Sequence, residues 1–166
     1  MNSLYLLRHA KAESQAEGGD PERRLTEAGR KSAKTISAAM VEARISPELV
    51  LCSESARTRE TLEAVLPAFK HAPQIAYEEA LYLADAKSLL ARLRHVPEIA
   101  RSVMLVGHNP GLHELAAMLS DRRDGPLMAR LAQGFPTSAL ASFDLLRPWP
   151  ELESGSAHLR ALFVLK

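Results

Sequence analysis

Short runs of apolar residues alternate along this chain with longer segments that mix apolar and polar positions. The runs at residues 4–7, 49–52 and 103–106 predict strands, and the first is typical of a strand buried on both faces. Two later runs, at residues 139–146 and 159–165, are bounded by proline and glycine signals and also predict strands.

Between these strands, apolar residues recur with helical spacing. Thr26 is a suitable N-cap for a helix that runs to about residue 44, with its apolar positions near one face. Residues 58–69 and 86–95 repeat apolar side chains every three or four positions, which predicts two further helices.

A fourth helix is expected after the third strand. Asn109 predicts its N-cap and Pro110 its first helical position. Strands that alternate with amphipathic helices indicate an α/β fold with a mostly parallel central sheet and helices on both faces. No internal repeat or long linker divides the chain, so we expect a single three-layer domain over residues 1–166.

The composition mainly excludes classes of protein. With 46% hydrophobic and 25% charged residues, the chain is typical of a folded globular protein and not of a disordered one. Its formal charge of +1 argues against a general nucleic-acid or membrane-surface binder, although a local basic pocket stays possible. The N-terminal apolar stretch is too short for a signal peptide, and no run approaches the length of a membrane span. We therefore expect a cytoplasmic protein.

Cofactor and metal signals are missing from the sequence. The single cysteine, Cys52, cannot form an internal disulfide, and no Cys/His cluster has metal-ligand spacing. Its position at the end of an apolar run favours a small buried residue over a reactive thiol. No glycine-rich phosphate loop of the nucleotide-binding types occurs. The sequence thus predicts neither a metal nor a cofactor.

Residues with chemical potential follow the predicted strands. Arg8 and His9 follow the first, Arg57 the second and His108 the third. Ligand sites of open α/β sheets lie beyond the carboxyl ends of the strands, so these side chains should converge. Arginine matches phosphate oxygens, and a neutral histidine, its pKa held down by nearby cations, can attack phosphorus. Each residue alone is more often a surface, capping or core residue, but together they predict a phosphoryl site.

Three segments resemble the signature segments of the histidine phosphatase superfamily, which has the phosphoglycerate-mutase-like fold: LRHA at 7–10, SESARTRET at 53–61 and VGHNP at 106–110. The short length, RLTEAG at 24–29 and EALY at 79–82 are similar to its small SixA-type phosphohistidine phosphatases. The similarity extends over nearly the whole chain. One departure is Ala10, where the family has glycine, and alanine is tolerated there if the backbone φ is negative.

The resemblance implies roles for individual residues. His9 would be the phosphorylated nucleophile, Arg8 and Arg57 would bind phosphoryl oxygens, and His108 would donate to them. Glu79 is the best match to the family's general acid, and its alternative is a solvated turn residue.

The activity that the resemblance implies is a metal-independent phosphatase that works through a phosphohistidine intermediate, with protein phosphohistidine as its substrate. A small-molecule phosphomonoesterase with the same site is one alternative. A phosphate-binding module without turnover is another.

Overall fold

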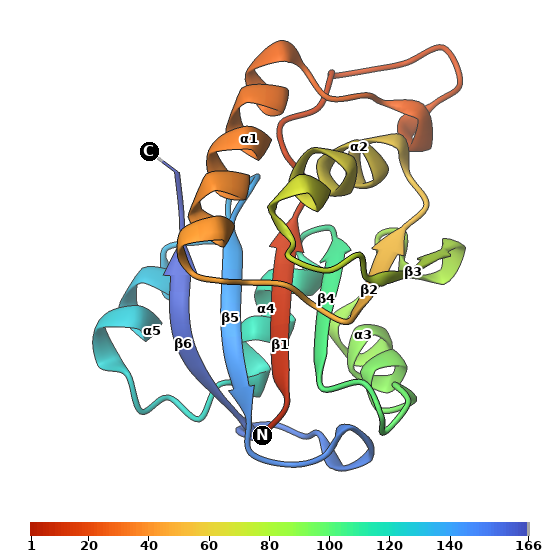
Figure 1. Ribbon diagram of the computed structural model, residues 1–166. Helices are drawn as coiled ribbons and strands as arrows, with labels where there is room; N and C mark the ends of the chain where they lie inside the picture. The colour runs from red at the N-terminus through yellow and green to blue at the C-terminus, as the bar shows by residue number, and fades with distance from the viewer. Residues whose placement is uncertain (166) are drawn as a thin grey trace.

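A six-stranded sheet forms the centre of the computed structural model, which describes residues 1–165 (Figure 1). The strand order is β3-β2-β4-β1-β5-β6, and β5 runs antiparallel to the other five strands. The predicted mostly parallel sheet is confirmed. The strands are β1 (Ser3–Arg8), β2 (Leu49–Ser53), β3 (Gln74–Glu78), β4 (Ser102–Gly107), β5 (Leu140–Leu145) and β6 (Ala157–Phe163).

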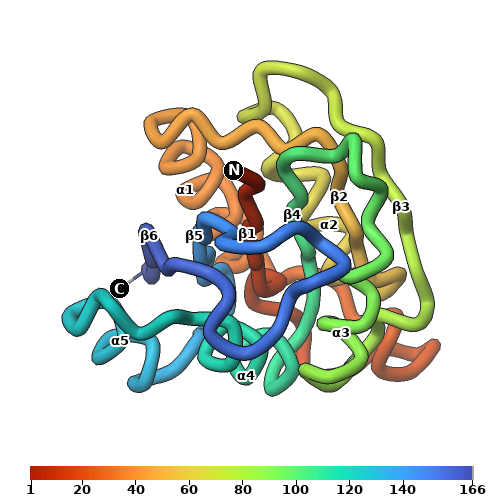
Figure 2. The backbone as a smooth tube through the Cα atoms, turned by 90° about the horizontal axis from the view of Figure 1, so that it is seen from below, coloured from red at the N-terminus to blue at the C-terminus, as the bar shows by residue number. Residues whose placement is uncertain are grey.

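Five α-helices cover the two faces of this sheet in the described chain. Figure 2 shows α1 on one side of the row of strands and α3, α4 and α5 on the other. Successive side chains of β1 point to opposite faces of the sheet. Leu7 packs with residues of α1 and α2, whereas Leu6 packs with residues of α3 and α4. The helices are α1 (Glu27–Glu42), α2 (Ala56–Val65), α3 (Ala86–Leu93), α4 (Gly111–Leu119) and α5 (Gly125–Ala132).

The register of the parallel strands aligns their carboxyl ends. Arg8 lies opposite Gly107 in the β1–β4 pair, and Cys52 lies opposite Val106 in the β2–β4 pair. The segments that follow β1, β2 and β4 therefore leave the sheet at one edge. This is the edge at which the sequence predicts a ligand site.

Local signals explain most helix boundaries. The Thr26 hydroxyl accepts a hydrogen bond from the Gly29 N–H at 2.9 Å, as expected for the N-cap of α1. The helix predicted at 58–69 is shifted: it begins at Ala56 and ends at Val65, where the chain tightens into a 3-10 turn that contains Pro67. Proline has no N–H to continue the α-helical hydrogen bonds.

The prediction for the start of α4 is wrong by one position. Pro110, not Asn109, is the N-cap, and its carbonyl accepts from the Glu114 N–H at 3.0 Å. Asn109 lies outside the helix and joins two segments instead. Its Oδ1 accepts from the His113 N–H at 3.3 Å, and its Nδ2 donates to the Phe135 carbonyl at 2.7 Å.

Two elements were not predicted. Strand β3 is a half-buried edge strand of five residues, too short and too mixed to form a clear apolar run. Helix α5 follows Asp124, whose carboxylate accepts from the Leu127 N–H at 2.9 Å, with a proline in its first turn. An N-cap followed by proline is a start signal that the sequence did contain.

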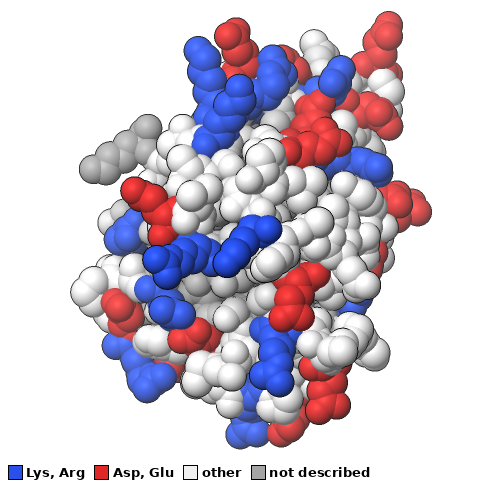
Figure 3. All heavy atoms as spheres, in the orientation of Figure 1, with Lys and Arg blue, Asp and Glu red and all other residues white. Residues whose placement is uncertain are grey.

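Four short 3-10 helices complete the described chain: η1 (Asp20–Glu22), η2 (Leu66–Ala68), η3 (Glu79–Leu81) and η4 (Trp149–Glu151). None of the helices in residues 1–165 has the length and apolar character needed to span a membrane. On the face shown in Figure 3, basic and acidic side chains are interspersed, in keeping with the nearly balanced charge of the chain.

Candidate active site

The four side chains singled out in the sequence converge at the carboxyl edge of the sheet. Arg8 ends β1, His9 follows it, His108 follows β4, and Arg57 lies in the first turn of α2. The ring centres of His9 and His108 are 5.4 Å apart. All four line one cavity of about 280 Å³, together with Lys11, Ala12, Arg23, Leu83, Asn109 and Thr137. Within residues 1–165, the lining contains four cations and no carboxylate.

The backbone fixes the tautomer of His9. Its Nδ1 lies 2.8 Å from the Ala10 carbonyl oxygen, which can only accept a hydrogen bond, so Nδ1 carries the proton. This leaves the lone pair on Nε2. Burial lowers the pKa of His9 to about 4, and the charges of Arg57 and Arg8 act in the same direction. The imidazole is therefore neutral at pH 7 and can act as a nucleophile.

His108 is held by a buried serine. Its Nε2 lies 2.8 Å from Ser53 Oγ, and both side chains are buried. Burial first, and then the charge of Arg57, lowers the pKa of His108 to about 3. If Ser53 donates this hydrogen bond, the proton of the neutral imidazole lies on Nδ1, which becomes a donor. Nothing in the sequence pattern singles out Ser53 for this role.

The two arginines differ in how they are anchored. Arg57 is 2% exposed, and its Nη1 and Nη2 donate to the carbonyl and the carboxylate of Asp20 at 2.9 and 3.0 Å. Arg8 is half-buried, and its Nη1 donates to the Phe135 carbonyl at 3.3 Å. Burial and the charge of Arg57 lower the pKa of Arg8, although a guanidinium stays charged at neutral pH.

Unsatisfied polar atoms gather at this site. In the described residues, four buried side-chain nitrogen or oxygen atoms have no hydrogen-bond partner, and three of them are Arg8 Nε, Arg57 Nε and His108 Nδ1. A buried polar group without a partner costs about 1–3 kcal/mol, so folded proteins keep few of them. Three such groups around a cluster of cations indicate a site made for an anion.

Two residues of the site were missed in the sequence. The carboxylate of Asp20 accepts hydrogen bonds from Tyr82 Oη, from Arg57 and from Arg23 Nε. The bond from Tyr82, followed by those from the arginines, lowers the pKa of Asp20 to about 2. Tyr82 also meets the ring of His108 edge-on, with 5.3 Å between the ring centres. Asp20 lies in a predicted loop, and its two partners at the site, Arg57 and Tyr82, are 37 and 62 positions away, so no local pattern reports these two contacts.

The structure does not bring Glu79 into this group. Glu79 opens η3, is exposed and lies outside the set of residues that line the cavity. Its neighbour Glu78 pairs with Arg92, with 2.7 Å between Oε1 and Nε. The role of Glu79 as a general acid therefore stays a prediction from the sequence.

Cys52 is buried, and burial raises the pKa of its thiol to about 12, which makes it unreactive at neutral pH. Among residues 1–165, no three His, Cys, Asp or Glu side chains are grouped so that they could hold a metal ion. The chemistry of the cavity is that of a neutral imidazole surrounded by guanidinium and imidazole donors.

Comparisons with known proteins agree with this chemistry. The family model of the histidine phosphatase superfamily (branch 1) matches residues 4–82. The solved SixA structure from Agrobacterium tumefaciens is 36% identical, covers 99% of this chain and 98% of its own, and has a TM-score of 0.82. The protein histidine phosphatase SixA complexed with tungstate is 25% identical, with coverages of 96% and 95% and a TM-score of 0.77. An uncharacterized protein of Mycobacterium leprae is 31% identical over 118 residues, which are 70% of this chain and 71% of that protein.

Proposed function

Because the chain belongs to the histidine phosphatase superfamily and is a phosphatase, we propose that it hydrolyses phosphohistidine on proteins without a metal ion, through a phosphohistidine of its own at His9. The observation that carries this proposal is the neutral His9 imidazole, with its Nε2 lone pair available, beside three buried nitrogen atoms that have no hydrogen-bond partner. The likeness to SixA phosphohistidine phosphatases over nearly the whole chain supports the substrate class.

The first step is a displacement at phosphorus. The phosphoryl group binds among Arg8, Arg57 and His108, and the lone pair of His9 Nε2 attacks the phosphorus atom. The new P–N bond forms as the bond to the substrate imidazole breaks. That imidazole leaves with the bonding electron pair, and its nitrogen then takes up a proton from water. The His9 ring becomes cationic as it is phosphorylated, and its Nδ1–H bond to the Ala10 carbonyl favours that charge.

The second step returns the enzyme to its starting state. Water attacks the phosphorus atom of phosphorylated His9, the P–N bond breaks, and its electron pair goes back to Nε2. The attacking water loses one proton, and inorganic phosphate is released. In both steps the transition state spreads negative charge over the equatorial oxygens, where fixed arginine donors stabilise it most.

The size of the cavity supports a protein substrate over a small phosphoester. About 280 Å³ lies just below the range of roughly 300–1,000 Å³ that is usual for sites enclosing a whole small molecule. A phosphorylated side chain can enter such a cavity while the remainder of a protein stays outside it. This cavity by itself is smaller than the usual site of an enzyme that encloses a whole small phosphoester.

A substrate profile tests the proposal. Phosphate release is compared for a phosphohistidine protein, a set of sugar phosphates and a phosphoserine peptide, each with the wild type and with His9→Ala as the inactive control. We expect kcat/KM to be highest for the phosphohistidine protein. A higher value for a sugar phosphate would overturn the substrate class, and phosphate binding without any turnover would overturn the enzymatic activity.

A further inference from the structure

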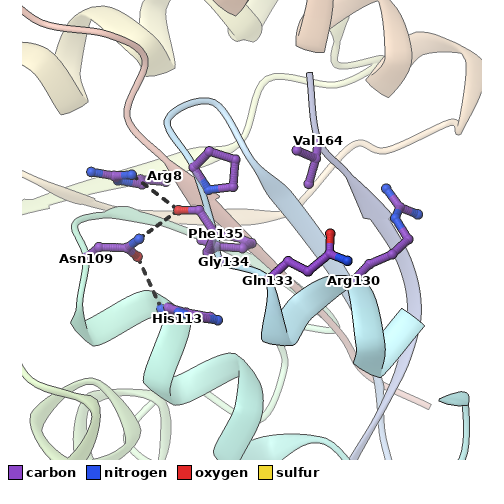
Figure 4. Close-up of a pocket in the computed structure, with 9 residues that line it drawn as sticks. Arg8, Asn109, His113, Arg130, Gln133, Gly134, Phe135 and Val164 are labelled. Atoms are coloured by element: carbon purple, nitrogen blue, oxygen red, sulfur yellow. Dashed lines mark hydrogen bonds between the residues drawn. The ribbon is translucent and has the colours of Figure 1, made fainter. Parts of the chain in front are cut away.

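A second cavity, of about 530 Å³, adjoins the first and shares Arg8 and Asn109 with it (Figure 4). It lies between α4, α5, the loop after α5 and the segment that follows β6. In Figure 4, Arg8 and Asn109 reach toward the Phe135 carbonyl from one side, and Arg130 and Val164 lie at the other end. None of the roles proposed above requires this space.

The walls of the second cavity are fixed by hydrogen bonds. The Phe135 carbonyl accepts from Arg8 Nη1 at 3.3 Å and from Asn109 Nδ2 at 2.7 Å, and the Phe135 ring is buried. His113 Nε2 lies 2.6 Å from the Leu131 carbonyl oxygen, which ties α4 to α5. Arg130 Nη2 donates to the Leu162 carbonyl at 2.9 Å, which ties α5 to β6. A ligand would therefore meet a surface that is already arranged.

The charge of this surface has one sign. Arg8 and Arg130 are the charged groups of the lining, Asn109 and Gln133 contribute amides, and within residues 1–165 no Asp or Glu belongs to it. Guanidinium and amide donors bind carboxylate oxygens well. The volume lies within the range usual for a ligand site and exceeds what one carboxylate fills.

We propose that the second cavity binds acidic side chains of the substrate protein, in the segment next to its phosphohistidine. This inference rests on the proposed function. The first cavity has room for the phosphorylated side chain, so the neighbouring residues of the substrate must lie across the adjoining surface. The shared residue Arg8 would contact the phosphoryl group with one side of its guanidinium and border the acidic segment with the other.

Gln133 offers a test that leaves the catalytic residues unchanged. It is exposed on the rim of the second cavity and does not line the first. Gln133→Glu and Gln133→Lys add opposite charges to a side chain of similar length. Gln74 on the far edge strand β3 is also exposed, and Gln74→Glu and Gln74→Lys are the matched controls.

The variants are assayed with two short synthetic phosphohistidine peptides, one with Glu and one with Gln beside the phosphohistidine, and with p-nitrophenyl phosphate. For the Glu peptide, we expect Gln133→Glu to raise KM and Gln133→Lys to lower it, each by about threefold, the size typical of a partly solvated charge pair. The Gln peptide, p-nitrophenyl phosphate and the Gln74 variants should show no such change.

The outcomes separate this inference from the proposed function. Equal KM values for the Glu peptide in both Gln133 variants, with normal phosphohistidine turnover, would overturn the acidic-segment site and leave the function intact. Parallel changes with p-nitrophenyl phosphate would mean that Gln133 affects the catalytic cavity, which also overturns it. A wild type that hydrolyses p-nitrophenyl phosphate but neither peptide would overturn the proposed function and this inference together.

Discussion

His108 and Ser53 form a buried pair in which the imidazole Nε2 lies 2.8 Å from the serine hydroxyl oxygen. Histidine has two nitrogens, and the partner of one determines which form the other takes. A hydroxyl that donates to Nε2 leaves the proton on Nδ1, the atom that has no protein partner among the described residues. Ser53 would thus act as a positioning residue that keeps His108 ready to donate to a phosphoryl oxygen.

Ser53→Ala tests this pair. We expect kcat to fall by about tenfold, because losing one buried hydrogen bond raises the free energy of the transition state by about 1–2 kcal/mol. The ¹⁵N chemical shifts of His108 should move from a single Nδ1–H tautomer toward a mixture. Ser120→Ala removes another buried serine hydroxyl and is the control. An unchanged tautomer with an unchanged kcat would contradict the role of Ser53.

Asp20→Asn tests the carboxylate that holds Arg57. The Asp20 carboxylate is 3.0 Å from Arg57 Nη2, and it repels any dianion that binds to the same guanidinium. An asparagine keeps an acceptor for Arg57 and removes the negative charge. Inorganic phosphate, measured as a competitive inhibitor, should therefore bind a few-fold more tightly to Asp20→Asn. Weaker phosphate binding would mean that Asp20 acts mainly by holding Arg57 in place.

Glu79→Gln separates the sequence prediction from the geometry. A general acid is worth about 10²–10⁴ in rate for a poor leaving group and little for a good one. Because Glu79 is exposed and does not line the cavity, we expect equal activities of wild type and Glu79→Gln on both alkyl and aryl phosphates. A loss confined to alkyl phosphates would restore the role that the family resemblance implies.

The buried imidazoles predict how stability varies with pH. His9 has a pKa of about 4 in the folded chain, against about 6.5 when unfolded, so the unfolded chain binds its proton first as the pH falls. Its contribution to the free energy of unfolding is complete above pH 6.5 and is lost progressively between about pH 6.5 and pH 4. Urea unfolding at pH 7 and pH 5 should show that the wild type loses about 1–2 kcal/mol more than His9→Ala. Equal losses would contradict a neutral, buried His9.

The sequence predicted the parts of the fold that rest on strong local patterns. The runs that became β1, β2 and β4 are almost entirely buried, and the cap at Thr26 is a local hydrogen bond. Strand β3 was missed because an edge strand is half-exposed and so loses the uniform apolar pattern. The start of α4 was misplaced because Asn109 forms hydrogen bonds with both α4 and the distant Phe135 carbonyl.

The site residues, too, could be predicted where a local pattern placed them and were missed where tertiary packing placed them. Arg8, His9 and His108 could be placed together because each lies within a residue of a strand end, and the parallel register then aligns them. Asp20 could not be found in this way, since its loop has no periodicity and its place beside Arg57 depends on tertiary packing. Glu79 was proposed by order along the chain, which does not report the direction of an exposed side chain.

Trapping the phosphoenzyme tests the covalent mechanism at His9 directly. The wild type is mixed with ³²P-labelled phosphohistidine protein in the presence of EDTA, quenched in alkali, digested and mapped by mass spectrometry. We expect the label on His9, stable in alkali and lost in acid, and we expect neither label nor turnover in His9→Ala. An unlabelled His9 during measurable turnover, or His9→Ala activity near that of the wild type, would contradict the covalent mechanism. Loss of activity in EDTA that a divalent ion restores would contradict metal independence.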